Sequence, residues 1–222
     1  MAHWAPRKLN DHNTGAPVNT TLIIIAITCV VSFVAFNNSA LLERLILWPP
    51  AVSRGKQYYR LITYGLVHAS PGHLIFNMIT LFFFGEAMER QYTQYLGPFG
   101  FAGFYIGGLI VSILPTFLDN RNNPHYRSLG ASGAVSAVLF AFILIKPWAT
   151  IYVYFLPVPA IVFAVLYIVY SIYMDQRSSD NVNHSAHLWG AAYGVAFTAV
   201  MEPRLLSLFL SSLMHPEFKL QH

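Results

Sequence analysis

The stretch "SLGASGAVSAVLF", residues 128–140, places Ser132 among glycine and alanine residues at the start of an apolar run. In this setting Ser132 is a packing residue, a turn residue or a nucleophile. Small residues in such a run are most often a close-packing device between helices, and a serine there commonly bonds its own backbone. The choice depends on which polar groups other segments bring to the same depth.

The composition indicates a membrane protein. Of the 222 residues, 55% are hydrophobic and only 10% are charged, whereas soluble domains carry about 25% charged residues. The charges collect between long apolar runs, which is typical of a polytopic membrane protein. The net charge of +4 fits basic loops. No basic cluster is separate from the membrane flanks, so we expect no nucleic-acid partner.

The apolar runs predict an all-α membrane protein with six transmembrane helices, because a span needs about 20 mostly apolar residues. The predicted spans are residues 18–36, 73–88, 96–118, 131–145, 151–174 and 185–201. The second and fourth are short and contain polar groups. Such spans persist where neighbouring helices enclose them, so we expect both at the centre of the bundle.

The spans and the segments on either side of them divide the chain into three predicted regions. Residues 1–17 form a polar N-terminal segment, 18–201 the six-helix domain, and 202–222 a C-terminal tail with an interfacial helix. The long first loop, 37–72, contains aromatic residues that favour the membrane interface, so we expect it to lie there. Lys and Arg number six on the side of the termini and seven on the other, which leaves the orientation open.

Three polar side chains are expected at one depth. Alternate spans run in the same direction, and His73, Ser132 and His187 each lie near the start of one of the even-numbered spans. All three therefore face the same side of the membrane. Three functional groups at one depth are the minimum for a site.

Small residues predict that the fourth and sixth spans approach closely. The fourth carries Gly133 and Ala137 four residues apart, and the sixth carries Ala186, Gly190 and Gly194 at the same spacing. Such spacing forms a groove that lets two helix backbones meet. A hydroxyl of Ser132 near a neutral imidazole of His187 can lose its proton during attack on a carbonyl.

The neighbouring residues suggest a Ser–His dyad with an oxyanion hole. No acidic residue lies in the fourth or sixth span, and Asp175 and Asp180 lie in the loop before the sixth. His73 and Asn77 are four residues apart, so they share one helix face and both can donate hydrogen bonds. The backbone N–H of Ser132 is a third donor if a helix begins there.

Metal binding is the alternative for the histidines. His184 and His187 are three residues apart and could bind a metal, with His68 and His73 as further ligands. No carboxylate or cysteine pair completes such a site, so we expect neither a metal nor another cofactor.

Taken together, the motifs resemble the rhomboid family of intramembrane serine proteases. The matching motifs are "GASG" at 130–133, "HLIFN" at 73–77, "AHLWGAAYG" at 186–194, "GEAMER" at 85–90 and "YYR" at 58–60. The resemblance covers about residues 59–201. The first motif alone is weak, but the serine, His-x-x-x-Asn and Ala-His-x-x-Gly-x-x-x-Gly motifs in this order are specific together.

The resemblance implies a six-helix rhomboid-like bundle and a serine endopeptidase that needs no cofactor. Ser132 would be the nucleophile and His187 the base, with an oxyanion hole of His73, Asn77 and the Ser132 amide. Its partners would be transmembrane protein substrates and the lipid bilayer. The resemblance also implies a multi-pass protein of the bacterial inner membrane, with both termini in the cytoplasm and the site opening outward.

Two positions depart from the family pattern. Many relatives carry an aromatic residue four positions after the serine, where it packs against the histidine. Here that position is Ser136, so something else must hold the imidazole. Tyr59 replaces a tryptophan in the first loop.

Tyr167, Tyr170 and Tyr173 lie in the fifth span, which the family uses for lateral substrate entry.

The sequence alone leaves two other functions open. A non-catalytic rhomboid-like protein that binds or sorts membrane proteins would share the fold, although it would have no need for both Ser132 and His187. A metal-dependent membrane enzyme or transporter would instead use the four histidines named above.

Overall fold

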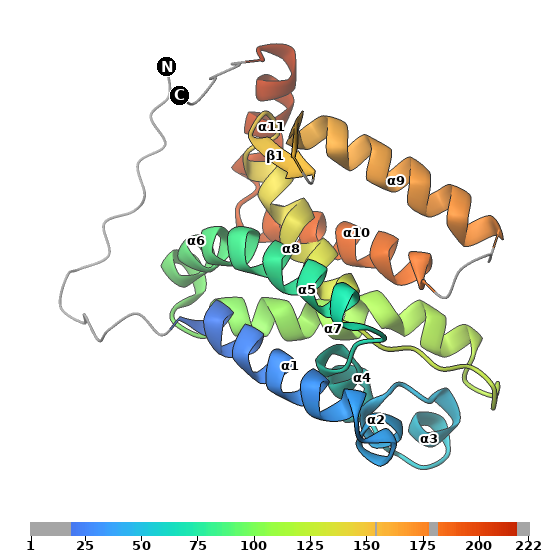
Figure 1. Ribbon diagram of the computed structural model, residues 1–222. Coiled ribbons are helices and arrows are strands. Elements are labelled where there is room, and N and C mark those ends of the chain that lie inside the picture. Colours follow the sequence, from blue (N-terminus) through green and yellow to red (C-terminus); the bar gives the residue numbers. More distant parts are fainter. Residues whose placement is uncertain (1–18, 154, 178–181, 217–222) are drawn as a thin grey trace.

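The structure is a computed structural model that describes residues 19–153, 155–177 and 182–216. The predicted N-terminal segment 1–17, Val18 and Asp180 therefore lie outside the described residues, as does the end of the tail. The described chain is helical except for one short hairpin and the connecting loops (Figure 1).

Six helical segments correspond one to one to the predicted spans. They are α1 (Thr20–Phe36), the continuous run of α5 (Pro71–Thr80), η2 (Leu81–Gly85) and α6 (Glu86–Leu96), then α7 (Gly100–Asp119), α8 (Ser132–Ile145), α9 (Ala160–Arg177) and α10 (His184–Met201). Within the described residues, α7 and α9 alone are long and apolar enough to cross a membrane by themselves. Two bent helix pairs and the shorter apolar helices α1 and α8 account for the rest, which is compatible with six spans.

Two predicted boundaries were wrong. The second predicted span ended at residue 88, but the helix continues through η2, a π-helical turn, to Leu96, where Gly97 adopts a positive φ of 77°. The fifth was predicted from residue 151. Residues 150–159 instead form an antiparallel hairpin of β1 (Thr150–Val153) and β2 (Leu156–Pro159), and α9 begins only at Ala160.

Helix α8 is the centre of the bundle, as expected for the fourth span. Nearly every residue from Gly133 to Leu144 is buried, and Figure 1 shows α8 passing between α5 and α10. Helix α9 lies at the edge beside α10, and few of its residues are buried. The small residues of α8 explain its position, since they let neighbouring helices approach from several sides.

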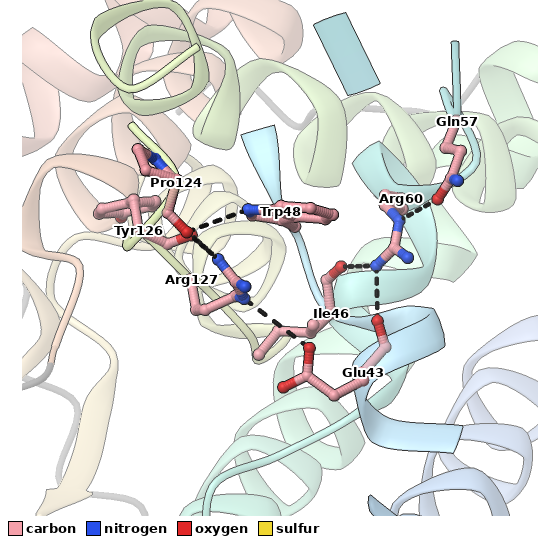
Figure 2. A network of polar contacts seen from close by, with 8 residues as sticks. All are labelled: Glu43, Ile46, Trp48, Gln57, Arg60, Pro124, Tyr126 and Arg127. Atoms are coloured by element: carbon pink, nitrogen blue, oxygen red, sulfur yellow. Dashed lines mark hydrogen bonds and ion pairs between the residues drawn. The ribbon is translucent and has the colours of Figure 1, made fainter. Parts of the chain in front are cut away.

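The first loop folds onto the loop that precedes α8. It contains α2 (Ser39–Leu45), α3 (Pro49–Ser53), α4 (Arg60–Thr63) and the 3-10 turn η1 (Tyr64–Leu66). Arg60 is only 6% exposed, and its guanidinium donates to the carbonyl oxygens of Glu43 and Ile46 and to Gln57 Oε1 (Figure 2). A buried guanidinium with three acceptors fixes the shape of this loop.

The contact between the two loops is also polar. Trp48 Nε1 donates to the carbonyl of Pro124 at 3.2 Å, and the Arg127 guanidinium lies 4.7 Å from the Trp48 ring centroid (Figure 2). Leu47 and Ser128 exchange backbone hydrogen bonds of 2.9 and 3.2 Å. The first loop therefore holds residue 128, four positions before Ser132.

The C-terminal tail contains α11 (Arg204–Met214), in agreement with the helix expected there. It meets α10 at a bend of 113°. Trp148 Nε1 donates to the carbonyl of Ser212 at 2.7 Å, which docks α11 beside the end of α8.

Candidate active site

Ser132 is the first residue of α8, directly after a turn that only glycine accommodates easily. Gly130 has a φ of +109°, and a Cβ there would lie 2.7 Å from Cε1 of His73. Gly130 N–H donates to the Tyr64 carbonyl at 2.9 Å. The turn therefore places the N-terminus of α8 against the first turn of α5. Because α8 begins at Ser132, its N–H is among those with no acceptor inside the helix.

His187 lies in the first turn of α10, next to Ser132. Its Nε2 is 2.8 Å from Ser132 Oγ, and both residues are half-buried. The helix start is fixed by Asn183, whose side chain accepts from Ala186 N–H at 2.9 Å. An Asn cap of this kind satisfies one of the unpaired N–H groups of the first turn.

Contact between α8 and α10 explains the short distance. A Cβ at Gly190 would overlap the Gly133 carbonyl oxygen, and a Cβ at Gly194 would overlap that of Ala137. The two backbones therefore touch along two helical turns. This is the close approach that the small residues predicted.

The two side chains expected as oxyanion donors lie on α5. His73 is beside the Gly130 turn, and Asn77 lies one turn further along, 2% exposed. One N–H of the Asn77 amide donates to the His73 carbonyl at 2.9 Å. The amide has a second N–H, so a donor remains for a bound group.

Tyr167 of α9 packs against His187, in the place of the aromatic residue that many relatives carry at the position of Ser136. Its ring is stacked on the imidazole, with centroids 6.0 Å apart and planes 29° apart. Its hydroxyl is 2.5 Å from Ser136 Oγ. The sequence placed Tyr167 in the right span but gave no sign of its partner, because the rotation of α9 about its axis is set by packing.

The other histidines do not gather into one group. His184 is in edge contact with both His187 and Tyr170, and His68 with His73. Among the described residues, no three His, Cys, Asp or Glu side chains are grouped as metal ligands would be. Asp175 lies in the last turn of α9, not in a loop as predicted.

His68 was missed as a neighbour of the site. It lies between η1 and α5 and is 2% exposed. Its Nε2 accepts from the N–H of Ala131, the residue before Ser132, at 3.4 Å. The histidine in the loop was visible in the sequence, but its contact with α8 depends on the fold.

Comparison with known proteins agrees with this arrangement. The family model described as the Rhomboid domain matches residues 55–204. "RHOMBOID-like protein 12, mitochondrial" from Arabidopsis thaliana is 30% identical over 202 residues, which is 86% of this chain and 58% of the relative. A Bacillus subtilis (strain 168) protein named "Putative rhomboid protease YdcA" is 33% identical over 97 residues, 41% of this chain and 46% of the relative.

The chain spans about half the length of these curated relatives. The family model, in contrast, covers most of the chain, from the first loop to the start of α11, and it contains His73, Ser132 and His187. The helical bundle and its apolar spans fit an integral membrane protein. This chain belongs to the rhomboid family.

Proposed function

We propose that this protein is an intramembrane serine endopeptidase that cleaves transmembrane or juxtamembrane segments of other membrane proteins. The observation that carries the proposal is the 2.8 Å separation between Ser132 Oγ and His187 Nε2. A nucleophile and a base at this distance are the minimum for acyl transfer. Family membership supports the same activity, and so does the similarity to a Bacillus protein named a putative rhomboid protease.

In the first step, Ser132 Oγ attacks the scissile carbonyl while His187 Nε2 takes the hydroxyl proton. The carbonyl π electrons move to oxygen, which becomes an oxyanion in a tetrahedral intermediate. When the intermediate collapses, the C–N bond breaks and His187 returns the proton to the leaving amine. Ser132 is left as an acyl ester.

The oxyanion needs hydrogen-bond donors that are already in place. The proposed donors are the Ser132 amide, the imidazole of His73 and the second N–H of Asn77. His73 and Ser132 lie in the first turns of α5 and α8, which meet at Gly130, and Asn77 lies one turn further along α5. The bond from Asn77 to the His73 carbonyl would hold the amide in one orientation.

Deacylation repeats the chemistry with water as the nucleophile. His187 takes a proton from water, the hydroxide adds to the ester carbonyl, and the proton passes to Ser132 Oγ as the ester bond breaks. Water reaches such a site from the membrane surface, and the half-buried state of Ser132 and His187 is compatible with this route. No cofactor takes part in these steps.

The substrate must present an accessible carbonyl. In an intact helix each carbonyl is bonded four residues ahead, so the substrate helix has to unwind locally before attack. We therefore propose substrates that are transmembrane proteins with helices that unwind easily, in contact with the enzyme inside the lipid bilayer.

We propose a bacterial inner membrane as the location, with both termini in the cytoplasm. The Bacillus relative comes from a bacterium, whereas the Arabidopsis relative carries a mitochondrial name. Membrane fractionation, and protease accessibility of tags on the two termini, would test the location and the orientation separately.

The decisive test is labelling of the purified protein by a fluorophosphonate probe, together with cleavage of a model single-span substrate. We expect the wild type to label and cleave, and Ser132→Ala and His187→Ala to do neither. Ser207→Ala, on α11 away from the site, is the matched control and should behave as the wild type. A folded wild type that neither labels nor cleaves would instead support the non-catalytic binding or sorting function.

A further inference from the structure

Helix α9 is held to the bundle by a narrow face. Its buried residues are Ala160, Ala164 and Ser171, whereas most of its large apolar side chains are exposed. An apolar hollow of about 480 Å³ lies between α9 and α10, lined among others by Ile168 and Val195. Tyr167 lies on the same narrow face, between Ala164 and Ser171, and reaches across to α8 and α10.

The Tyr167 hydroxyl belongs to a directed chain of hydrogen bonds. Ser136 Oγ donates to the Ser132 carbonyl at 2.8 Å. A serine hydroxyl has one proton, so Ser136 must accept in its 2.5 Å contact with Tyr167. The chain therefore runs from the Tyr167 hydroxyl to Ser136 and on to the backbone of Ser132.

The Tyr167 ring also has fixed neighbours. It stacks on His187, and Phe140 and Phe163 contact it at centroid distances of 5.4 and 5.8 Å. A ring fixed at its hydroxyl and packed on two sides is a rigid surface for the imidazole. Aromatic contacts of this geometry are favourable beyond the area that they bury.

We propose that Tyr167 is the positioning residue of His187, and that it makes the dyad geometry depend on the position of α9. This inference rests on the proposed function of Ser132 and His187. Tyr167 touches no reacting atom: it holds the imidazole plane so that Nε2 faces Ser132 Oγ, and its hydroxyl ties that plane to the residue that carries the nucleophile. Displacing α9 removes both contacts at once.

The test compares Tyr167→Leu and Tyr167→Phe with Tyr173→Leu, a control on the same helix whose ring contacts Arg177. The readouts are the fluorophosphonate labelling rate and the kcat and KM for a model substrate. For Tyr167→Leu we expect labelling and kcat to fall about tenfold with KM nearly unchanged. Tyr167→Phe keeps the stacked ring and should recover most of the loss, and Tyr173→Leu should match the wild type.

A Tyr167→Leu variant that keeps its labelling rate and kcat, and loses only thermal stability or raises KM, would overturn the inference. The NMR signal of His187 Hε1 separates this failure from failure of the proposed function. The ring current of Tyr167 shifts that signal whether or not the protein is a protease. If the wild type does not label, the proposed function fails, but the positioning inference can still be tested. The loss of the ring current shifts the His187 signal in Tyr167→Leu in any case, so the line width decides: a signal that stays sharp would refute positioning, and a broadened signal would support it.

Discussion

Asn77 has two roles that one substitution can separate. One amide N–H bonds the His73 carbonyl within α5, and the other is the proposed oxyanion donor. The first role stabilises the helix locally, and the second acts only when negative charge develops on the substrate. The two roles therefore predict different measurements.

We expect Asn77→Ala to lower kcat on the order of 10²-fold, the effect of removing one oxyanion donor, with thermal stability nearly unchanged. Thr80→Ala is the matched control, because Thr80 Oγ1 makes the same four-residue bond to a carbonyl of α5 at an exposed position. Kinetics and thermal unfolding in detergent would be measured for both. If Asn77→Ala unfolds the protein, or loses activity only in proportion to stability, the residue is structural and not a donor.

The sequence predicts the depth of single residues in the membrane better than it predicts which side chains they contact. Ser132, His187 and His73 could be placed at one depth because alternate helices run in the same direction. Ser136 indicated that the imidazole needs another neighbour, but not that Tyr167 would supply it. Tyr167, Tyr170 and Tyr173 are equivalent in the sequence, and only the rotation of α9 distinguishes them.

At the level of elements, α8 and α10 depend on the absence of side chains between them. A Cβ at Gly190 would overlap the carbonyl oxygen of Gly133, which belongs to the backbone and cannot move aside. The helices would have to separate, and Ser132 would move away from His187. Gly103 on α7 has no atom within 4 Å of such a Cβ.

We expect Gly190→Ala to destabilise the bundle by about 1–3 kcal/mol, the usual effect of overpacking, and to reduce cleavage more than tenfold. Gly103→Ala should be neutral or slightly stabilising, since alanine favours the helix. Thermal unfolding and substrate cleavage would be measured side by side. Equal behaviour of the two variants would mean that close approach of α8 and α10 is unnecessary.

Helix α1 is attached to the bundle through its N-terminus. The Glu89 carboxylate accepts from Thr20 N–H at 2.6 Å, from Thr21 N–H at 2.9 Å and from Thr21 Oγ1 at 2.6 Å. A carboxylate at this place satisfies unpaired N–H groups and complements the positive end of the helix dipole.

Glu89→Gln should destabilise the protein by about 1–2 kcal/mol, because one acceptor oxygen becomes an amide that faces donors. Glu86→Gln, half-buried on the same helix, should have little effect. Thermal unfolding in detergent is the measurement. Similar losses in both variants would indicate a general effect of charge and not a cap on α1.

Glu89 also explains why the second span was predicted too short. Glu89 and Arg90 were assigned to a loop because charged residues usually end a span. The Glu89 carboxylate instead accepts hydrogen bonds from the N-terminus of α1. The fifth span was predicted too early for a different reason. Its apolar residues include Pro157 and Pro159, which disfavour a helix interior and are found in the hairpin. Hydrophobicity therefore predicted which segments are helical. The ends of these two helices depend on the contact of Glu89 with α1 and on the prolines of the hairpin.

In the whole molecule, His68 contacts three helical regions, α1, α5 and the start of α8, from one buried position. Its Nδ1 is 3.0 Å from Ser32 Oγ on α1, its Nε2 accepts from Ala131 N–H before α8, and its ring contacts His73 on α5. Ser32 Oγ donates its one proton to the Leu66 carbonyl at 2.8 Å. His68 must therefore carry its proton on Nδ1 and keep Nε2 as an acceptor.

Protonation of His68 would place a second N–H against the N–H of Ala131. Burial, with a smaller contribution from the nearby imidazole of His73, lowers the pKa of His68 to about 3. The unfolded chain has the ordinary value of about 6.5, so between these pH values the unfolded state binds more protons than the folded state. The contribution of neutral His68 to the free energy of unfolding is therefore fully present above about pH 6.5, and it is lost as the pH falls towards 3.

We expect the unfolding free energy to fall by up to about 1.4 kcal/mol per pH unit through this group between pH 6.5 and 4.5, above the range in which most carboxylates titrate. His68→Gln is neutral and keeps an acceptor, so its stability should be lower at pH 7.5 but flatter over the same interval. His125→Gln, an exposed histidine in the loop before α8, should retain the wild-type slope. Chemical unfolding in detergent at several pH values measures all three. Parallel curves for the wild type and His68→Gln would show that other groups cause the acid sensitivity, and that this junction does not depend on a neutral imidazole.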